Sequence, residues 1–214
     1  MAWLQKRPQI GDSIQFYTVG LNKTVLIVGL GNPGSEYEMT RHNAGFFCAD
    51  EFVRKNSDME GWISKKDLKC ELNTGRLGET KVYVMKPTTF MNLSGEAVRA
   101  VCDFYKIPLD HLVVLHDELD IDFGQIRMRT GGGSAGHNGV KSVSQHMGED
   151  YGRIRIGIGP KNPVQIDSAD YVLQKFSDDE SSQLPNLALE VNAVLNEYIY
   201  GGQALPTETR NFIV

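Results

Sequence analysis

A three-layer α/β sandwich, a single domain whose twisted mixed, mostly parallel sheet carries helices on both faces, is the fold that the sequence predicts. Short β-branched runs alternate with amphipathic helical patterns along most of the chain. The 214 residues are 41% hydrophobic and 23% charged, which suffices for one sizeable core. We expect one domain at residues 24–200 that includes a C-terminal helix, with an N-terminal extension at 1–23 and a C-terminal tail at 201–214.

The predicted strands are short and apolar. The first, at residues 25–28, is β-branched and stops at Gly29, and the others lie at 81–85, 112–115, 125–130 and 153–158. Thr40 is the expected N-cap of the first helix and Ser94 that of the second. The predicted apolar helix faces hold Ala44, Phe47, Cys48 and Phe52 in the first helix, Ala97, Val98, Val101 and Tyr105 in the second, Val140, Val143 and Met147 in the third, and Leu187, Val191, Val194, Leu195 and Tyr198 in the last, at 184–199.

Cysteine usage and hydropathy indicate a cytoplasmic protein. Cys48, Cys70 and Cys102 are widely spaced, odd in number and form no C-x-x-C pair, which argues against a disulfide framework and a cysteine-based zinc site. Residues 1–20 lack the apolar core of a signal peptide, and no window approaches the roughly 18 apolar residues of a membrane span. We therefore expect neither export nor a membrane anchor.

The formal net charge of -5 has the wrong sign for binding nucleic acid through the overall field of the protein. The distribution of charge is more informative. Residues 125–161 carry six lysines and arginines against Glu149 and Asp150, whereas the chain from Phe176 onward carries six acids and one arginine. The basic middle segment is compatible with a local phosphate-binding face, and an ordinary solvated face is the alternative.

Residues 29–34, GLGNPG, follow a predicted strand and fit the G-x-G-x-x-G pattern of dinucleotide-binding sites. A Rossmann turn needs a helix that begins inside the motif, so that its amides face a pyrophosphate, whereas here the helix is expected several residues later. Pro33 and Gly34 fit the two central positions of a type II turn instead. The ribose-binding acid should end a second strand, but Asp50 and Glu51 fall inside a helical pattern. The context disfavours nucleotide binding.

Residues 132–136, GGSAG, fit the G-x-S-x-G pattern of a serine nucleophile, whose partners follow in the order serine, acid, histidine. No histidine follows His146, and the first acid after Ser134 is Glu149, so that order cannot occur here. Ser134 is better explained as part of a glycine loop that leads into a helix near His137, where free amides could hold an anion. A plain linker is the alternative.

A metal site is the third alternative. Residues 116–120, HDELD, together with His42 and His137, are of types that bind metals. No H-E-x-x-H or comparable spacing places two histidines on one helix face, and acids at strand ends are commonly caps or orienting groups. We expect no metal.

Several polar residues follow predicted strand ends, where open α/β sheets place their sites. A histidine in the first turn of a helix should stay neutral and able to accept a proton, because the helix dipole disfavours its charged form. An aspartate can orient that imidazole, and asparagines can donate to an oxyanion without competing for protons. Taken singly, each residue has an ordinary structural explanation, but together they predict one pocket formed by Asn32, Tyr37, His42, Asn43, Asn92, Asp117 and Asn138.

Six segments, in order along the chain, resemble the successive signatures of the bacterial-type peptidyl-tRNA hydrolases. The match spans roughly residues 25–176, and the segments are far more specific together than any single pattern above. The segments are LIVGLGNPGSEY at 26–37, TRHNAGF at 40–46, KPTTFMNLSG at 86–95, HDELD at 116–120, GGGSAGHNGVK at 131–141 and RIRIGIG at 153–159.

The resemblance implies a monomeric, cytoplasmic hydrolase that needs no metal, cofactor or obligate protein partner. Such an enzyme cleaves the ester between a peptide and the tRNA 3′ ribose, which recycles tRNA from peptidyl-tRNA released prematurely during translation. By position, His42 is the general base that activates water and Asp117 holds it. Asn32 resembles the residue that distinguishes a blocked amino group from a free one, and Asn92 is the expected oxyanion donor.

The substrate-binding residues also follow from the resemblance. Their expected ligands are the peptide, the CCA end and the acceptor stem of the tRNA. Two arginines occupy the family's phosphate-clamp positions, since paired guanidiniums can hold a phosphate bidentately. The residues are Tyr37, Phe90, Met91, Asn92 and Asn138 for the peptide and terminal nucleotides, and Arg129, Arg155 and Lys141 for the acceptor stem.

Some positions depart from the family pattern. Ser134 and Ala135 stand where many members have histidine and glycine, and Pro160 to Asn162 end the last motif differently, which puts the loop's contacts in doubt. The strongest rival is a non-catalytic RNA-binding relative of the same fold, which should have lost the base or its partner. His42 and Asp117 are both present.

Overall fold

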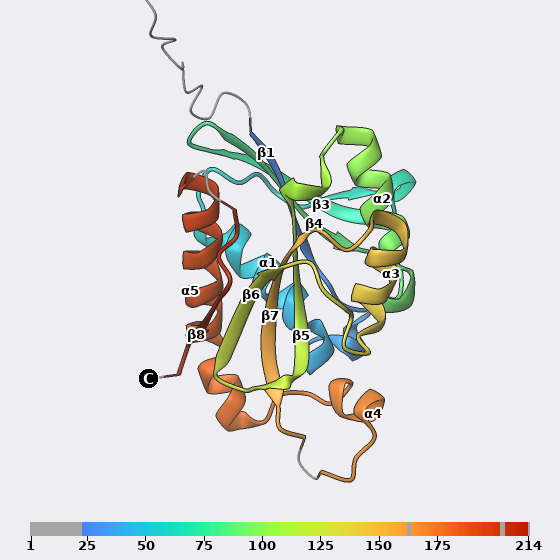
Figure 1. Cartoon of the computed structure of the whole chain (residues 1–214), viewed down its shortest axis with the longest axis vertical. Coiled ribbons are helices and arrows are strands. Elements are labelled where there is room, and N and C mark those ends of the chain that lie inside the picture. The colour runs from blue at the N-terminus through green and yellow to red at the C-terminus, as the bar shows by residue number, and fades with distance from the viewer. Residues whose placement is uncertain (1–22, 162–163, 202–203, 214) are drawn as a thin grey trace, which may run out of the picture.

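The computed structural model describes residues 23–161, 164–201 and 204–213, and one eight-stranded sheet runs through them (Figure 1). The strand order is β2-β3-β4-β1-β5-β7-β6-β8. The predicted N-terminal extension lies outside the described residues except for Lys23. The strands are β1 (Thr24–Gly29), β2 (Ile63–Lys65), β3 (Cys70–Leu77), β4 (Thr80–Pro87), β5 (Leu112–Asp122), β6 (Gln125–Thr130), β7 (Gly152–Gly159) and β8 (Glu208–Asn211).

The centre of the sheet is parallel and its two flanks are antiparallel. β4, β1, β5 and β7 form the parallel ladders, whereas β2, β3, β6 and β8 pair antiparallel to their neighbours. The α/β fold with a mixed sheet is therefore confirmed, with the parallel pairing confined to the four central strands. The carboxyl ends of these parallel strands meet at one edge, where an open α/β sheet forms its binding crevice.

Helices cover both faces of the sheet. α1 (Ala44–Lys55) and α5 (Asp178–Gly201) pack on one face, and α2 (Ser94–Tyr105) and α3 (Asn138–Met147) pack on the other (Figure 1). The short helix α4 (Ser168–Val172) lies beyond the end of β7, at the bottom of Figure 1. Within the described ranges, no helix combines the length and the apolar character needed to cross a membrane.

Strand β1 explains why the sequence predicts the centre of the fold well. Val25 and Ile27 point into the core beneath α1 and α5, and Leu26 and Val28 point into the core beneath α2 and α3. All four side chains are fully buried. A strand buried on both faces reads as an unbroken apolar run rather than an alternating one.

Three strands have no counterpart in the sequence prediction. β2 and β3 lie on one flank, and β8, in the segment predicted as a tail, pairs with β6 at the opposite edge. β5 also extends beyond the predicted residues 112–115, as far as Asp122. The missed strands carry polar residues and a glycine, so they lack the apolar pattern on which the prediction relied.

Three local predictions were wrong. Thr40 does not cap α1 with its side chain, because a 3-10 turn at Arg41–Asn43 comes first and the Thr40 hydroxyl donates to the Tyr37 carbonyl. Gly34 has φ 116° and ψ 145°, outside the type II turn, and leads into a second 3-10 turn at Ser35–Tyr37. Ser94 is likewise the first residue of α2 rather than its cap.

Candidate active site

The predicted site residues meet in a cavity of about 1000 Å³, here called the larger cavity, at the carboxyl ends of the central strands. Asn32 follows β1, Asp117 lies on β5, and His42 comes from the 3-10 turn before α1. The α4 segment and Pro160 complete its wall. The predicted residues in its lining are His42, Asp117, Asn32, Asn92, Asn138, Phe90 and Met91.

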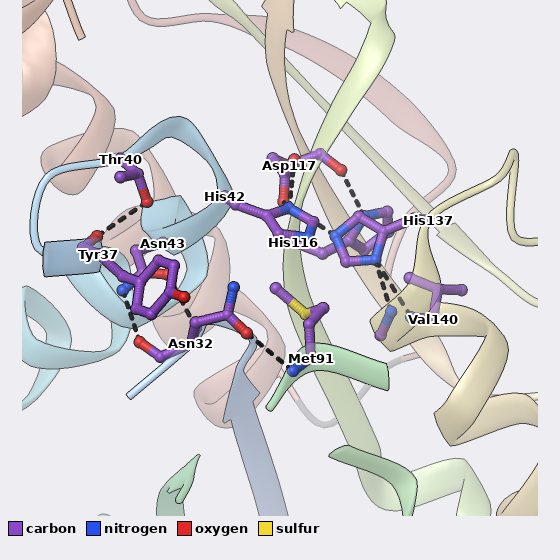
Figure 2. Close-up of polar contacts among 11 residues, drawn as sticks. Asn32, Tyr37, Thr40, His42, Asn43, Met91, His116, Asp117, His137 and Val140 are labelled. Atoms are coloured by element: carbon purple, nitrogen blue, oxygen red, sulfur yellow. Dashed lines mark hydrogen bonds and ion pairs between the residues drawn. The ribbon is translucent and has the colours of Figure 1, made fainter. Parts of the chain in front are cut away.

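His42 is held by a buried carboxylate. Its Nδ1 lies 3.0 Å from Oδ1 and 3.0 Å from Oδ2 of Asp117, and Asp117 is 2% exposed (Figure 2). An ionised carboxylate can only accept, so Nδ1 carries the proton and donates it. The second nitrogen, Nε2, is thereby left unprotonated in the neutral ring. His42 lines the larger cavity, and its Nε2 can accept a proton from a molecule bound in that cavity.

His137 contacts the same carboxylate from the other side, a role that the sequence prediction missed. Its Nδ1 accepts hydrogen bonds from the backbone N–H groups of Gly139 and Val140, at 3.1 and 3.2 Å, and so caps α3 (Figure 2). Because Nδ1 is an acceptor, the proton of the neutral ring sits on Nε2, which donates to Asp117 Oδ1 at 2.9 Å. The expectation that these amides are free to hold an anion was wrong, since His137 uses them.

The electrostatics of this imidazole–carboxylate cluster, formed by His42, Asp117 and His137, differ from those expected for a helix N-terminus. Burial alone would lower the pKa of His42, but the charge and hydrogen bond of Asp117 outweigh burial and raise it above its ordinary value. Burial alone would raise the pKa of Asp117, but His137 and His42 hold it well below its usual range. The sequence prediction that the helix dipole controls the protonation of His42 is wrong. The charge and hydrogen bond of Asp117 control it.

His116 lies behind this cluster and stays neutral. Burial, with a smaller contribution from His137, places the pKa of His116 well below its ordinary value. Its Nδ1 lies 2.7 Å from the backbone carbonyl oxygen of Asp117, so Nδ1 donates and fixes the part of β5 that carries the carboxylate. His116 therefore supports Asp117 through the backbone, whereas His137 supports it through the side chain.

Asn32 is fixed by three hydrogen bonds. The Asn43 side chain accepts from the Asn32 backbone N–H at 2.8 Å and donates to its carbonyl at 3.0 Å, and Asn32 Oδ1 accepts from the Met91 N–H at 2.8 Å (Figure 2). Since Oδ1 is occupied by a donor, the amide nitrogen Nδ2 faces the opposite way. Nδ2 bonds to no residue that the structure describes, so Asn32 presents only donors to a ligand.

The remaining predicted contacts surround the cavity mouth. Asn92 and Asn138 are exposed, and their amides can turn toward a bound molecule. Phe90 is 55% exposed and meets the ring of Tyr37 edge-on, with centroids 6.4 Å apart. Tyr37 does not itself line the cavity, and it contributes through Phe90.

The predicted phosphate-binding arginines belong to a larger arginine cluster on β6 and β7, formed by Arg127, Arg129, Arg153 and Arg155. Arg127 pairs across the strands with Arg155, and Arg129 with Arg153. Arg153 is fully buried, and it joins Arg129 in donating to the Gly133 carbonyl, at 2.8 and 3.0 Å. Arg153 thus holds the glycine loop, while Arg129 and Arg155 remain half-buried.

The arginine cluster lies beside the larger cavity rather than in it. Arg155 pairs in register with His116, and its Nη1 lies 3.6 Å from Oε2 of Glu118. Lys141 is exposed on α3 and shares a helix face with Asn138, three residues earlier. None of Arg129, Arg155 and Lys141 lines the cavity. These three cations can therefore contact a part of a ligand that extends beyond it.

Arg41 joins α4 and α5 to the turn that carries His42, a second role that the sequence prediction missed. Its guanidinium donates to the Lys175 carbonyl and pairs with Glu180, both at 2.6 Å. It also lies over the Tyr171 ring, 4.5 Å from the centroid. The α4 segment that lines the cavity is thereby anchored to the turn that carries the imidazole.

A family model described as "Peptidyl-tRNA hydrolase" matches residues 26–211. The chain belongs to this family. A peptidyl-tRNA hydrolase from Anaeromyxobacter sp. (strain K) is 49% identical over 160 residues, which cover 74% of this chain and 81% of that protein. One from Rickettsia bellii (strain RML369-C) is 42% identical over 189 residues, 88% of this chain and 91% of that protein.

Solved structures of peptidyl-tRNA hydrolases share the fold. The crystal structure of the enzyme from Acinetobacter baumannii superposes with a TM-score of 0.75 at 35% identity, covering 84% of this chain and 90% of that one. The family resemblance predicted from the six sequence segments is therefore confirmed, as is the fold. The roles of individual residues in this peptidyl-tRNA hydrolase family member rest on the geometry described above.

The imidazole–carboxylate cluster is also the group of residues best suited to hold a metal. One potential ligand atom from each of His42, Asp117 and His137 lies within 4.8 Å of the others. The hydrogen bonds, however, use Nδ1 of His42, Nε2 of His137 and both Asp117 oxygens on one another. The cluster is thus complete without a cation, and the expectation of no metal stays a prediction that a chelator can test.

Proposed function

We propose that the chain hydrolyses the ester bond between a peptide, or an N-blocked amino acid, and the 3′ ribose of tRNA. The observation that carries this proposal is the pairing of His42 with buried Asp117 at the wall of a cavity of about 1000 Å³. It supplies an oriented base for water, and no serine or cysteine that the structure describes hydrogen-bonds to His42. Family membership supports the choice of substrate.

In the proposed mechanism, Nε2 of His42 takes a proton from water and the resulting hydroxide attacks the ester carbonyl. Asp117 stabilises the imidazolium that forms. The Asn92 amide donates to the oxyanion of the tetrahedral intermediate. Collapse breaks the bond between carbon and the ribose oxygen, and the imidazolium returns its proton to that oxygen. The products are a peptide carboxylic acid and a tRNA with a free 3′ hydroxyl.

The modest machinery of this site suits an ester better than an amide. A ribose alkoxide is a far better leaving group than an amide nitrogen anion, and nitrogen resonance makes an amide carbonyl harder to attack than an ester carbonyl. One oriented general base and asparagine donors for one oxyanion therefore suffice for an ester, and the lining of the larger cavity supplies both. We therefore expect the peptide bonds of the substrate to remain intact.

Asn32 explains how the proposed enzyme spares ordinary aminoacyl-tRNA. Its Oδ1 is occupied by the Met91 N–H, so only the N–H groups of Nδ2 face a ligand. A blocked amino group offers a carbonyl oxygen that can accept from Nδ2, whereas a free α-ammonium offers only further donors. The free ammonium would also bring an unpaired charge to a largely buried site, which is costly.

The tRNA contacts and the cellular setting are part of the same proposal. Asn138 and Asn92 would contact the CCA end, with Phe90, Tyr37 and Met91 as flanking surfaces. Arg129 and Arg155, with Lys141, would hold acceptor-stem phosphates, because guanidinium and ammonium groups bind phosphate strongly. We further propose that the protein acts as a monomer in the cytoplasm, where peptidyl-tRNA is released, and needs no protein partner.

The test is release of labelled N-acetyl-amino acid from N-acetyl-aminoacyl-tRNA by the purified protein. We expect rapid release that survives a chelator, and a loss of roughly 10²- to 10⁴-fold in kcat/KM for His42→Ala, since that is the range for a removed general base. Unblocked aminoacyl-tRNA serves as the negative substrate.

No release by folded wild-type protein would refute the proposal. If the same protein still bound tRNA in a filter assay, the non-catalytic RNA-binding alternative would replace it. Release abolished by chelator and restored by Zn²⁺ would instead make the imidazole–carboxylate cluster a metal site.

A further inference from the structure

A second cavity, here called the smaller cavity, lies on the other side of Asn32. Its volume is about 490 Å³, within the range of sites for small ligands. Among the described residues, Asn32 alone lines both cavities. The smaller cavity is therefore a neighbour of the proposed reaction centre, and nothing in the mechanism above uses it.

The direction of the substrate follows from the proposed function and the orientation of Asn32. The ester carbonyl must lie at His42, and the carbonyl that blocks the amino group must lie at Nδ2 of Asn32. In a peptide, that second carbonyl belongs to the penultimate residue. Because Asn32 lines both cavities, the smaller cavity is within reach of the chain that would continue from this carbonyl, including the side chain of the penultimate residue.

The walls of the smaller cavity combine apolar and acidic side chains. Pro33, Met39, Phe46 and Phe47 supply the apolar surface, and the charged groups are Glu38, Asp50, Glu71 and Lys86. Three carboxylates thus face one ammonium. The net charge of the lining is negative, which disfavours an acidic ligand.

The single cation of the lining is already neutralised. Lys86 Nζ lies 2.7 Å from Asp50 Oδ1 and 3.6 Å from Glu71 Oε2, and 4.4 Å from the centroid of the Trp62 ring. The Lys86 side chain is only 15% exposed, whereas Asp50 and Glu71 are 45% and 46% exposed. The two carboxylates can therefore bind a second cation from solvent. Separating the largely buried Lys86 ammonium from Asp50 and Glu71 would cost free energy, because it would leave that charge unpaired.

We propose that the smaller cavity is a subsite for the penultimate residue of the peptide and that it prefers lysine or arginine there over aspartate or glutamate. A lysine or arginine side chain matches the lining because its apolar stem can pack on the aromatic and methionine surface while its charged end reaches the carboxylates. This subsite rests on the proposed function, since it requires an ester-linked peptide at His42.

The experiment compares two substrates that differ only at the penultimate residue, N-acetyl-lysyl-phenylalanyl-tRNA and N-acetyl-glutamyl-phenylalanyl-tRNA. N-acetyl-phenylalanyl-tRNA, which lacks that residue, is measured in parallel. We expect kcat/KM to be roughly 2- to 10-fold higher for the lysyl substrate at low salt, as for a partly exposed ion pair, and the ratio to shrink in 0.5 M salt.

Two variants change the charge of the subsite in opposite directions. Asp50→Asn combined with Glu71→Gln leaves Lys86 unpaired and should invert the preference toward the glutamyl substrate. Lys86→Met leaves the carboxylates unpaired and should increase the preference for lysine. A control with the same charge change, Glu79→Gln combined with Asp178→Asn, alters exposed acids outside the cavity and should keep the wild-type ratio.

The outcomes separate the two proposals. Equal rates on the lysyl and glutamyl substrates, with normal release from N-acetyl-phenylalanyl-tRNA, would overturn the subsite and leave the proposed function standing. A ratio that the Asp50 and Glu71 substitutions do not change would overturn it as well. Failure to hydrolyse N-acetyl-phenylalanyl-tRNA would overturn the proposed function and the subsite with it.

Discussion

The imidazole–carboxylate cluster and the arginine cluster are neighbours across β5 and β7, yet they are built in opposite ways. Asp117 is buried and both of its oxygens accept hydrogen bonds from imidazoles, so each group has one orientation. Arg129 and Arg155 are half-buried, and Arg155 is held by a long ion pair, with its Nη1 3.6 Å from Oε2 of Glu118. The imidazole–carboxylate cluster thus has a fixed geometry, whereas Arg129 and Arg155 of the arginine cluster place positive charge within reach of solvent.

This difference indicates a division of labour. Proton transfer demands atoms held within hydrogen-bond distance and in a defined protonation state, which burial and mutual bonding provide. Binding a polyanion demands charge that can adapt to phosphates whose positions vary, and salt screens such contacts. Substitutions in the first region should therefore change the chemical step and its pH dependence, and those in the second should change KM and its salt dependence.

Asp117→Asn should produce the largest effect in this comparison after loss of His42 itself. The neutral form of His42 is the base, so kcat/KM of the wild type should rise with pH through the pKa of His42, which Asp117 holds above its ordinary value. Without the carboxylate, that pKa falls and the midpoint of the profile moves to lower pH. The plateau should drop by roughly 10²- to 10⁴-fold. A pH profile of kcat/KM measures both changes, and an unmoved midpoint would contradict the role of Asp117.

Asn32→Asp should weaken discrimination between blocked and free amino groups. One carboxylate oxygen can still accept from the Met91 N–H, but the other now offers an acceptor where Nδ2 offered donors. We expect the ratio of kcat/KM for N-acetyl-aminoacyl-tRNA over aminoacyl-tRNA to fall by roughly 10- to 100-fold, the effect of leaving one buried partner unsatisfied. Asn186→Asp is the control, since it makes the same substitution at an exposed residue of α5 that lines neither cavity.

Two substitutions of His137 should separate its two contacts. His137→Ala removes both the cap on α3 and the bond to Asp117, so it should cost about 1 kcal/mol of stability and roughly 10-fold in kcat. Asparagine is a good N-cap, so His137→Asn should recover stability without recovering kcat. Thermal unfolding and kcat, measured on both variants, make the distinction. Recovery of kcat along with stability would show that His137 acts only through the helix.

The comparison also explains how much the sequence could predict. β1 was predictable because it is buried on both faces, and His42, Asp117 and Asn32 because they lie in recognisable motifs after or within the central strands. β8, with the residues Glu208–Asn211, was not predictable because an edge strand needs no apolar pattern.

The missed roles depend on distances that only folding creates. His137 is 20 residues from Asp117, and Arg41 lies 139 residues from its partner Glu180. The one available signal for His137 was its place directly before a helix, a position in which a polar side chain often caps the amides. No local pattern marks Arg41 as the anchor of α4 and α5.

In the arginine cluster, Arg129→Gln combined with Arg155→Gln should raise KM by roughly 10-fold at 0.1 M salt and leave kcat within about 2-fold, because lost phosphate contacts weaken binding rather than chemistry. The slope of log KM against log salt should fall by about 2, one unit for each phosphate contact. Arg54→Gln combined with Arg76→Gln, which changes two exposed arginines that line neither cavity, is the matched control. An unchanged salt slope would refute phosphate contact by these arginines.

Lys141→Ala should have the smallest effect, and it tests whether a single surface charge affects binding without affecting the imidazole–carboxylate cluster. Lys141 is exposed on α3, on the helix face that also carries Asn138, so it can approach a backbone phosphate of a tRNA whose CCA end lies at Asn138. A single solvated ammonium contributes little, so we expect KM to rise about 2-fold at 0.05 M salt and to match the wild type at 0.5 M, where the Debye length is only a few ångströms. Lys141→Arg keeps the charge and should behave as the wild type. A change in kcat or in the pH midpoint would mean that this surface charge reaches the imidazole–carboxylate cluster, and the separation between the two regions would then fail.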